Sequence, residues 1–218
     1  MAQVQEAEAV HVPAVAVASR WRPTPARLLQ LVVGLSIFGA GEALLVASNL
    51  GNSPWTVFAQ GLARQAGIGV GTATIAVSGL VLLAWIPLRQ PPGLGTIFNA
   101  VLIGVAIDVT LAILPSHIAL GVRIAMVPAG IAMVAVASGL YLTTRLGPGP
   151  RDGLMTGLHR RTGRSLRLVR VVIELTAVVG GVALGGTAGI GTLAFALAIG
   201  PGVQFWVHRL GGAETSTL

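Results

Sequence analysis

The sequence contains no cysteine and no lysine, and only 10% of its 218 residues are charged and 5% aromatic. Without cysteine, disulfides, thiolate metal sites and cysteine nucleophiles are excluded. The four histidines are not spaced as two ligands on one helix face, and the sequence has no nucleophile elbow, Walker loop or pair of catalytic carboxylates. We therefore expect no enzymatic activity, no metal site and no cofactor.

Hydrophobic residues make up 54% of the chain, which is typical of a polytopic membrane protein in contact with the lipid bilayer. The net charge of +7 does not indicate a nucleic-acid partner, because the arginines flank apolar segments and form no basic face with interleaved aromatics. Residues 1–26 predict a cytoplasmic tail. They do not resemble a signal peptide, because Glu6 and Glu8 are present and a positive start is absent.

An internal repeat organises the rest of the sequence: residues 27–114 recur at residues 123–210 with a constant offset of 96 positions. Leu50, Gly51, Pro54, Gly61, Gly67, Gly93 and Gly95 return as Leu146, Gly147, Pro150, Gly157, Gly163, Gly189 and Gly191. Residues 115–122 connect the two repeats, and residues 211–218 form a second predicted cytoplasmic tail. Two fused hydrophobic units, each with a break rich in glycine and proline, are typical of membrane transporters.

Six stretches are long enough to cross a bilayer as helices. They lie near residues 28–48, 70–88, 94–114, 122–143, 168–186 and 190–209. Two further apolar pieces, 54–66 and 150–162, would rise only about 20 Å as helices, which is too short for a hydrocarbon core of about 30 Å. We expect these two pieces to be re-entrant or interfacial half-helices.

The positions of the arginines predict the topology. With six spans and an inner amino terminus, all arginines except Arg64 and Arg123 fall on the cytoplasmic side. Three spans per repeat is an odd number, so the second repeat is inverted. In the alternative with eight spans, the arginine-rich segment 151–164 would lie in lipid at high cost. We predict an all-α transmembrane bundle of six spans and two half-helices, built from two inverted three-span repeats, with both termini cytoplasmic.

Polar residues gather at the two breaks, 49–55 and 145–152. Backbone that leaves a helix at membrane depth is tolerated where it lines protein or water, so these breaks are candidates for a solute site. The candidate binding residues are Asn49, Asn52, Ser53 and Asp152, together with Asn99, whose amide needs a partner or a wet cavity. The alternatives are ordinary surface loops and, for Asp152, a salt bridge with Arg145 or Arg151.

Three acidic residues, Glu42, Asp108 and Glu174, lie inside predicted spans, where carboxylates are expensive. Each is a candidate for proton coupling, because an acid in a cavity of alternating access can take up and release a proton. In the alternative interpretation, the three acids form interhelical hydrogen bonds or pair with Arg123 or Arg170.

The run from Gly93 to Asp108, with the upstream run from Ala47 to Thr56, resembles the YczE family within the wider YczE/YyaS/YitT group. The resemblance covers about residues 27–210 and implies a multi-pass protein of the bacterial cytoplasmic membrane. It implies no particular substrate.

The function that we predict from the sequence is a secondary transporter, proton-coupled in its simplest form, for a small polar, anionic or secondary-metabolite solute. The alternative is a membrane scaffold or accessory protein that docks cytosolic partners through its arginine-rich loop. Both interpretations leave a homo-oligomer open.

Overall fold

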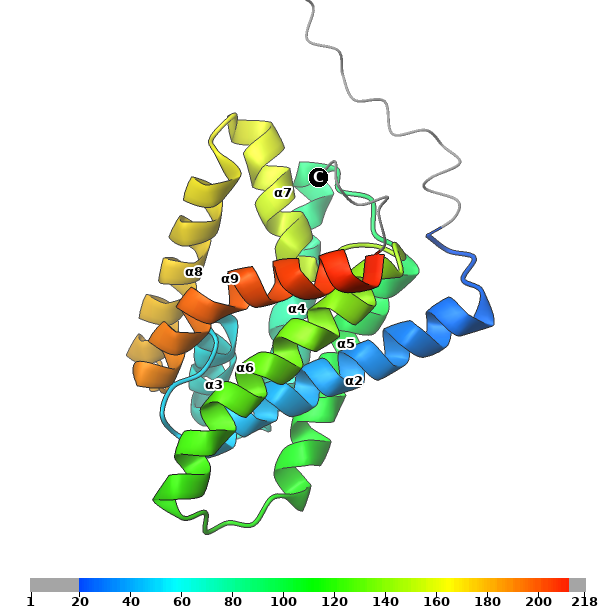
Figure 1. The fold of residues 1–218 in the computed structure, drawn as a ribbon. Coiled ribbons are helices and arrows are strands. Elements are labelled where there is room, and N and C mark those ends of the chain that lie inside the picture. Colours follow the sequence, from blue (N-terminus) through cyan, green and yellow to red (C-terminus); the bar gives the residue numbers. More distant parts are fainter. Residues whose placement is uncertain (1–19, 212–218) are drawn as a thin grey trace, which may run out of the picture.

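Eight α-helices make up the part of the chain that this computed structural model describes, residues 20–211 (Figure 1). They are α2 (Pro25–Ser48), α3 (Pro54–Ala66), α4 (Val70–Leu88), α5 (Leu94–Ile113), α6 (Leu120–Thr143), α7 (Pro150–Thr162), α8 (Leu166–Ala183) and α9 (Ile190–Gly211). Most of the two predicted tails, residues 1–19 and 212–218, lies outside the described range.

The helix boundaries follow the sequence repeat. Both short helices, α3 and α7, have 13 residues and begin at proline, and they end at Gly67 and Gly163 with φ of 65° and 66°. Proline suits the first helical position because it has no N–H to leave unpaired, and glycine accepts the left-handed cap conformation. The same sequence signals therefore start and stop the equivalent helix in each repeat.

The centre of the bundle is the pair formed by α2 and α6, which are equivalent helices of the two repeats. A side chain at Gly41 would come within 2.9 Å of the Gly130 carbonyl oxygen, and one at Gly34 within 3.3 Å of the Ala137 carbonyl oxygen. Residue numbers along α2 therefore increase while those of the facing residues on α6 decrease, so the two helices are antiparallel. The glycines let the two backbones approach closely, as is common in membrane helix pairs.

Contacts between the two repeats occur in reciprocal pairs. Gly95 N donates to the Leu146 carbonyl oxygen at 2.8 Å, and Gly191 N donates to the Leu50 carbonyl oxygen at 2.9 Å. These two hydrogen bonds join equivalent positions, with the roles of the repeats exchanged. At the level of whole helices, α3 packs against α8 and α7 packs against α4.

Both ends of α3 lie near one loop of the other repeat, residues 184–189. A side chain at Gly51, just before α3, would lie 2.7 Å from Gly189 N, and the Arg64 guanidinium near the end of α3 donates to the Gly185 carbonyl oxygen. In the other repeat, Arg161 Nη1 near the end of α7 donates to the Pro87 carbonyl oxygen at 2.8 Å. The end of α7 thus lies at the last turn of α4, and its start lies at the loop before α5, because a side chain at Gly147 would lie 3.2 Å from Gly93 N.

Five helices among the described residues are long and apolar enough to cross a membrane: α2, α4, α5, α6 and α9. The helix α8, which covers most of the stretch predicted to span at 168–186, is not among them. It includes Arg167, Arg170 and Glu174 within 18 residues. The all-helical class and several apolar, lipid-contacting helices agree with the sequence prediction.

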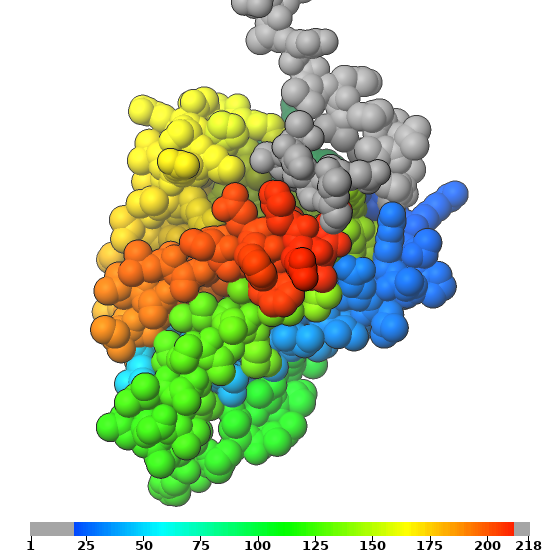
Figure 2. Space-filling view, in the orientation of Figure 1, coloured from blue at the N-terminus to red at the C-terminus, as the bar shows by residue number. Residues whose placement is uncertain are grey.

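The two repeats differ in how their last two long helices pack. In the first repeat α4 packs along α5, whereas α8 and α9 diverge from the loop that joins them (Figure 1). On the face seen in Figure 2, α9 runs between α7 and α8 on one side and α6 and α2 on the other. In the first repeat the last two long helices are therefore packed together, which we call closed. In the second repeat they are apart, which we call open.

Candidate functional site

A cavity of 620 Å³ lies where the two breaks of the chain meet. The break after α2 contributes Ser53, Pro54 and Trp55, and the break after α6 contributes Arg151 and Asp152. The cavity is completed by side chains of α2, α5, α6, α8 and α9. Its volume falls in the range of about 300–1,000 Å³ that is usual for small-molecule sites.

Trp55 and Arg151 form the contact between the two breaks. The Arg151 guanidinium carbon lies over the Trp55 ring, 5.3 Å from its centroid, in a cation–π arrangement. Trp55 is the second residue of α3 and Arg151 the second residue of α7, so the two side chains occupy equivalent positions in the repeats. Their stacking therefore places the cavity between equivalent positions of the two sequence repeats.

Glu42 of α2 lies deep in the cavity wall, with 1% of its surface exposed. Its Oε2 accepts a hydrogen bond from the Ser53 hydroxyl at 2.8 Å, and Ser53 in turn lies 3.1 Å from the Thr56 hydroxyl. The other carboxyl oxygen, Oε1, has no hydrogen-bond partner among the described residues. A buried carboxyl group with one free oxygen is costly unless a proton, a water or a ligand completes it.

The other charged groups of the cavity already have protein partners. Tyr141 donates its hydroxyl to Asp152 Oδ2 at 2.8 Å, and Arg170 Nε donates to Glu174 Oε1 at 2.9 Å in an ion pair one turn apart on α8. The same Tyr141 ring packs edge-on against Phe38 of α2. These contacts hold the Asp152 and Glu174 carboxylates in place.

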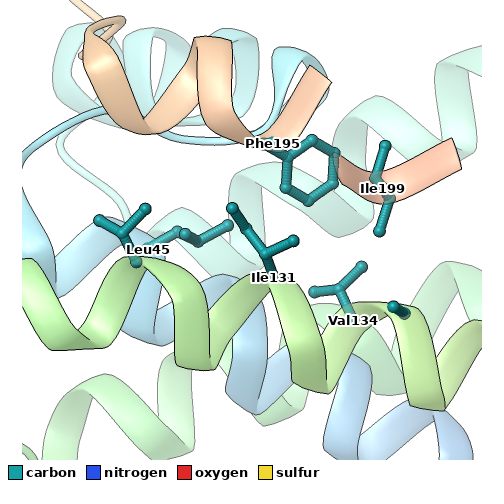
Figure 3. Packing of buried hydrophobic residues seen from close by; sticks show 7 residues of the cluster. Leu45, Ile131, Val134, Phe195 and Ile199 are labelled. Atoms are coloured by element: carbon teal, nitrogen blue, oxygen red, sulfur yellow. The ribbon is translucent and has the colours of Figure 1, made fainter. Parts of the chain in front are cut away.

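The opposite wall of the cavity is apolar and comes largely from α9. Phe195 and Ile199 of α9 line the cavity and also pack against Ile131 and Val134 of α6 (Figure 3). Val203 continues this wall along α9. The cavity therefore combines a charged end at the breaks with a hydrocarbon side at α9, which suits a solute of mixed character.

Five of the eight candidate residues from the sequence line this cavity: Ser53, Asn99, Asp152, Glu42 and Glu174. The other three, Asn49, Asn52 and Asp108, are not among the lining residues. Asn52 is buried and donates from Nδ2 to Gln60 Oε1 at 3.0 Å, and Asn49 Oδ1 lies 3.5 Å from the Thr187 hydroxyl. Both asparagines thus contact groups that tie the first break to α3 and to the loop after α8.

Asp108 caps the start of α4. Its carboxylate accepts hydrogen bonds from Gly71 N at 2.6 Å, from Thr72 N at 2.8 Å and from the Thr72 hydroxyl at 2.9 Å. The N-cap position of α4 is Gly69, which has no side chain to do this. Asp108 therefore satisfies the free N–H groups of α4 from a neighbouring helix.

The cavity residues that are absent from the sequence-based candidates include Trp55, Tyr141, Arg151, Arg170 and Gln204. For Arg151 the sequence contains a usable signal, because it stands directly after Pro150 at the same repeat position as Trp55. The sequence-based interpretation treats it only as a partner for Asp152. Gln204 also has a usable signal, because it stands at the repeat position of Asp108. For Tyr141 we find no signal in the sequence that separates it from ordinary helix residues.

Apolar helices packed around a polar, charged cavity define the class of this molecule: it is an integral membrane protein of the helical-bundle type. Residues 25–208 match the family model described as "Family of unknown function (DUF6198)". The chain belongs to the YczE family of bacterial membrane proteins, which confirms the resemblance drawn from its sequence.

Relatives of similar length support this assignment. The chain is 33% identical over 187 residues to the uncharacterized membrane protein YczE of Bacillus subtilis, covering 85% of this chain and 84% of the relative. It is 39% identical over 193 residues to an uncharacterized protein of Haemophilus influenzae, covering 88% of each chain. The uncharacterized protein YyaS of Bacillus subtilis is 26% identical over 165 residues, 74% of this chain and 82% of the relative. No solved structure matches.

Proposed function

We propose that this protein is a proton-coupled secondary transporter of a small solute, with its solute site in the cavity between the two breaks. The observation that supports this most directly is Glu42, a buried carboxyl group with one unpartnered oxygen in the wall of a cavity. Carboxyl groups at membrane depth mark proton and substrate pathways in transporters. The sequence predicts a small solute that is polar, anionic or a secondary metabolite.

The proposal includes an inverted repeat. A twofold axis parallel to the helices would make equivalent helices parallel, whereas an axis perpendicular to them makes equivalent helices antiparallel. The antiparallel pairing of α2 with α6, through Gly41 and Gly130, supports the second case. The reciprocal hydrogen bonds from Gly95 to Leu146 and from Gly191 to Leu50 support a twofold relation between the repeats. Inverted repeats with a site at their interface are common among secondary transporters.

In the proposed topology α8 is the sixth span and both termini are cytoplasmic in the bacterial inner membrane. The described chain begins and ends on the same side of the bundle, at the start of α2 and the end of α9 (Figure 1). The charges of α8 are compatible with a span because Arg170 and Glu174 pair with each other and line the cavity, and because Arg167 stands at the end of the helix, in its first turn. Paired charges that face a bundle interior are the usual way for such residues to occur in membranes.

The difference between the two repeats gives the proposal a conformational basis. Asp108 of α5 holds the start of α4, which keeps the first pair of helices together. The equivalent residue in the second repeat is Gln204, which lines the cavity, and α8 has its own cap in Ser165. We propose that alternating access exchanges these two arrangements: α4 and α5 separate while α8 and α9 close.

Flux measurements test the proposal. The protein is purified and placed in liposomes that contain a pH-sensitive dye, and a pH gradient is imposed. Solutes from a panel of organic cations, organic anions and neutral polar compounds are then added one at a time. We expect at least one solute to speed proton movement through the wild-type protein, and we expect Glu42→Gln to abolish this effect.

Asp108→Asn is the matched control, because it also removes an intramembrane acid but lies outside the cavity. It should retain solute-dependent proton movement, with a changed rate because it weakens the contact that holds α4 to α5. If no solute in the panel moves protons, or if Glu42→Gln behaves like the wild type, the transporter proposal is wrong. The scaffold alternative, which expects a dry bundle with internally paired acids, would then be favoured.

A further inference from the structure

The charges that line the cavity do not balance. Three carboxyl groups, Glu42, Asp152 and Glu174, face two guanidinium groups, Arg151 and Arg170. With every group ionised, the cavity carries one negative charge in excess. At membrane depth such an excess is unfavourable, so one positive charge is needed to complete the site.

The location of the missing positive charge follows from the pairing of the other groups. Glu174 is paired with Arg170, and Asp152 accepts a hydrogen bond from the Tyr141 hydroxyl. Arg151 stacks on Trp55 and interacts electrostatically with both Glu42 and Asp152, so its single charge is shared between two carboxyl groups. Glu42 Oε1 is the fully buried carboxyl oxygen of the cavity that has no hydrogen-bond partner among the described residues. An ionised carboxylate can only accept, so the group that completes Oε1 must be a donor or a cation.

The other walls of the cavity indicate what kind of cation fits. Trp55 and Tyr141 provide aromatic faces at the charged end, and Phe38 and Phe195 provide further aromatic surface. Aromatic rings attract organic cations through their electron-rich faces, and Arg151 occupies the Trp55 face in this structure. Ile199 of α9 adds hydrocarbon surface that would suit the apolar part of such a molecule. An inorganic ion would leave most of this surface unused.

An anion fits the cavity less well. The start of α7 is a place where an anion could meet free N–H groups, but Asp152 already stands in the first turn of that helix. An added anion would raise the excess negative charge unless a proton were bound at the same time.

We propose that the cavity binds a monovalent organic cation of amphipathic shape, whose charge takes the place of a proton on Glu42. This inference rests on the proposed carrier function and narrows its solute class. In the exchange, the cation enters, the O–H bond of protonated Glu42 breaks, the proton leaves to solvent and the carboxylate pairs with the cation. No other bond changes. The remaining charged or titratable groups of the site are Tyr141, Arg151, Asp152, Arg170 and Glu174.

Binding to the full-length protein in detergent micelles tests this directly. The probes are tetraphenylphosphonium and tetraphenylborate, which share size and shape and differ in the sign of their charge. We expect the cation to bind more tightly than the anion. Its affinity should rise by up to about tenfold for each unit of pH increase, over the pH range in which Glu42 is protonated when no ligand is bound. One proton should be released per bound cation in weakly buffered solution.

Glu42→Gln should weaken tetraphenylphosphonium binding by a factor of about 30 or more, since it removes one partner of a buried charge pair, and should abolish proton release. Asp108→Asn should bind like the wild type. Glu42→Asp is the second variant, for use if Glu42→Gln does not elute as a monodisperse protein. It keeps the carboxyl group, so it should still release a proton when the cation binds. Tighter binding of tetraphenylborate, or unchanged cation binding in Glu42→Gln, would overturn the inference.

This experiment and the flux experiment can fail separately. Cation binding with proton release but no flux would leave the ligand class standing and refute the transporter. Proton-coupled flux of an anion or a neutral solute, with no cation binding, would leave the transporter standing and refute the ligand class.

Discussion

The start of α7 is positioned by a contact between Trp85 and Gly153 that can be tested quantitatively. Trp85 of α4 is 3% exposed, and its indole Nε1 donates to the Pro150 carbonyl oxygen at 2.9 Å. A Cβ at Gly153 would overlap the six-membered ring of the Trp85 indole. Because Arg151 and Asp152 lie between Pro150 and Gly153, this contact also fixes the charged end of the cavity.

Two opposing effects determine the outcome of Gly153→Ala. Alanine in place of a helical glycine stabilises a helix by about 1 kcal/mol. Overpacking a buried contact costs about 1–3 kcal/mol, and we expect the upper end here because the overlapped group is a buried ring and not the end of a flexible chain. The net effect is a loss of about 2 kcal/mol, which lowers the melting temperature by roughly 4–8 °C in a chain of this length.

The effect of Gly153→Ala on the melting temperature should change sign when Trp85 is replaced by a residue with a smaller ring. Trp85→Phe removes the outer indole atoms and the hydrogen bond to Pro150, the latter worth about 1 kcal/mol. In that background the methyl group introduced by Gly153→Ala occupies vacated space, and the gain in helix propensity remains. Gly153→Ala should then raise the melting temperature by roughly 2–4 °C relative to Trp85→Phe alone.

Thermal unfolding of the wild type, the two single variants and the double variant in one detergent provides the measurement. Gly79→Ala is the control, because Gly79 lies in α4 with nothing within 4 Å of an added Cβ. It should be neutral or stabilising both in the wild type and in the Trp85→Phe background. Equal destabilisation by Gly153→Ala in these two backgrounds would refute the packing of α7 on α4 described above.

Two further predictions concern Asp108 and the short helix α3. Asp108→Asn should lower the free energy of unfolding by about 1–2 kcal/mol, as expected for a weakened helix cap, while solute-dependent proton movement continues; loss of that movement at unchanged stability would assign Asp108 to coupling instead. Single cysteines placed at the exposed positions Asn49 and Arg64 should react with an impermeant thiol reagent from the same side of the membrane, without background because the chain has no cysteine. Labelling from opposite sides would mean that α3 crosses the bilayer.

The sequence was sufficient to predict the two short helices and most of the helix boundaries. Pro54 and Pro150 begin α3 and α7 as predicted, because proline at the first helical position acts through local backbone geometry. The offset of 96 positions then transfers each boundary from one repeat to the other. Local signals and a repeat are independent of tertiary packing, which is why both could be read without a structure.

The centre of the site could be predicted only in part. The equivalence of Trp55 and Arg151 is visible in the sequence. Their contact, however, depends on how α2 and α6 pack, because these helices precede the two breaks. Asp108 gives a second example. Gly69 leaves the start of α4 without a side-chain cap, and the Asp108 carboxylate supplies that cap because α5 packs next to α4. The distance between α4 and α5 is set by tertiary packing and could not be predicted from local sequence signals.

The two repeats share a backbone plan but differ in the side chains that meet at their interface. Glu42 is equivalent to Ser138, and Trp55 is equivalent to Arg151, so each pair contains one charged and one uncharged member. A rigid scaffold would gain stability from apolar residues at such positions, because buried ion pairs are often less stable than well-packed hydrocarbon. Charged side chains at these positions, beside a cavity that one repeat leaves open, therefore favour a molecule that exchanges two conformations around a bound charge.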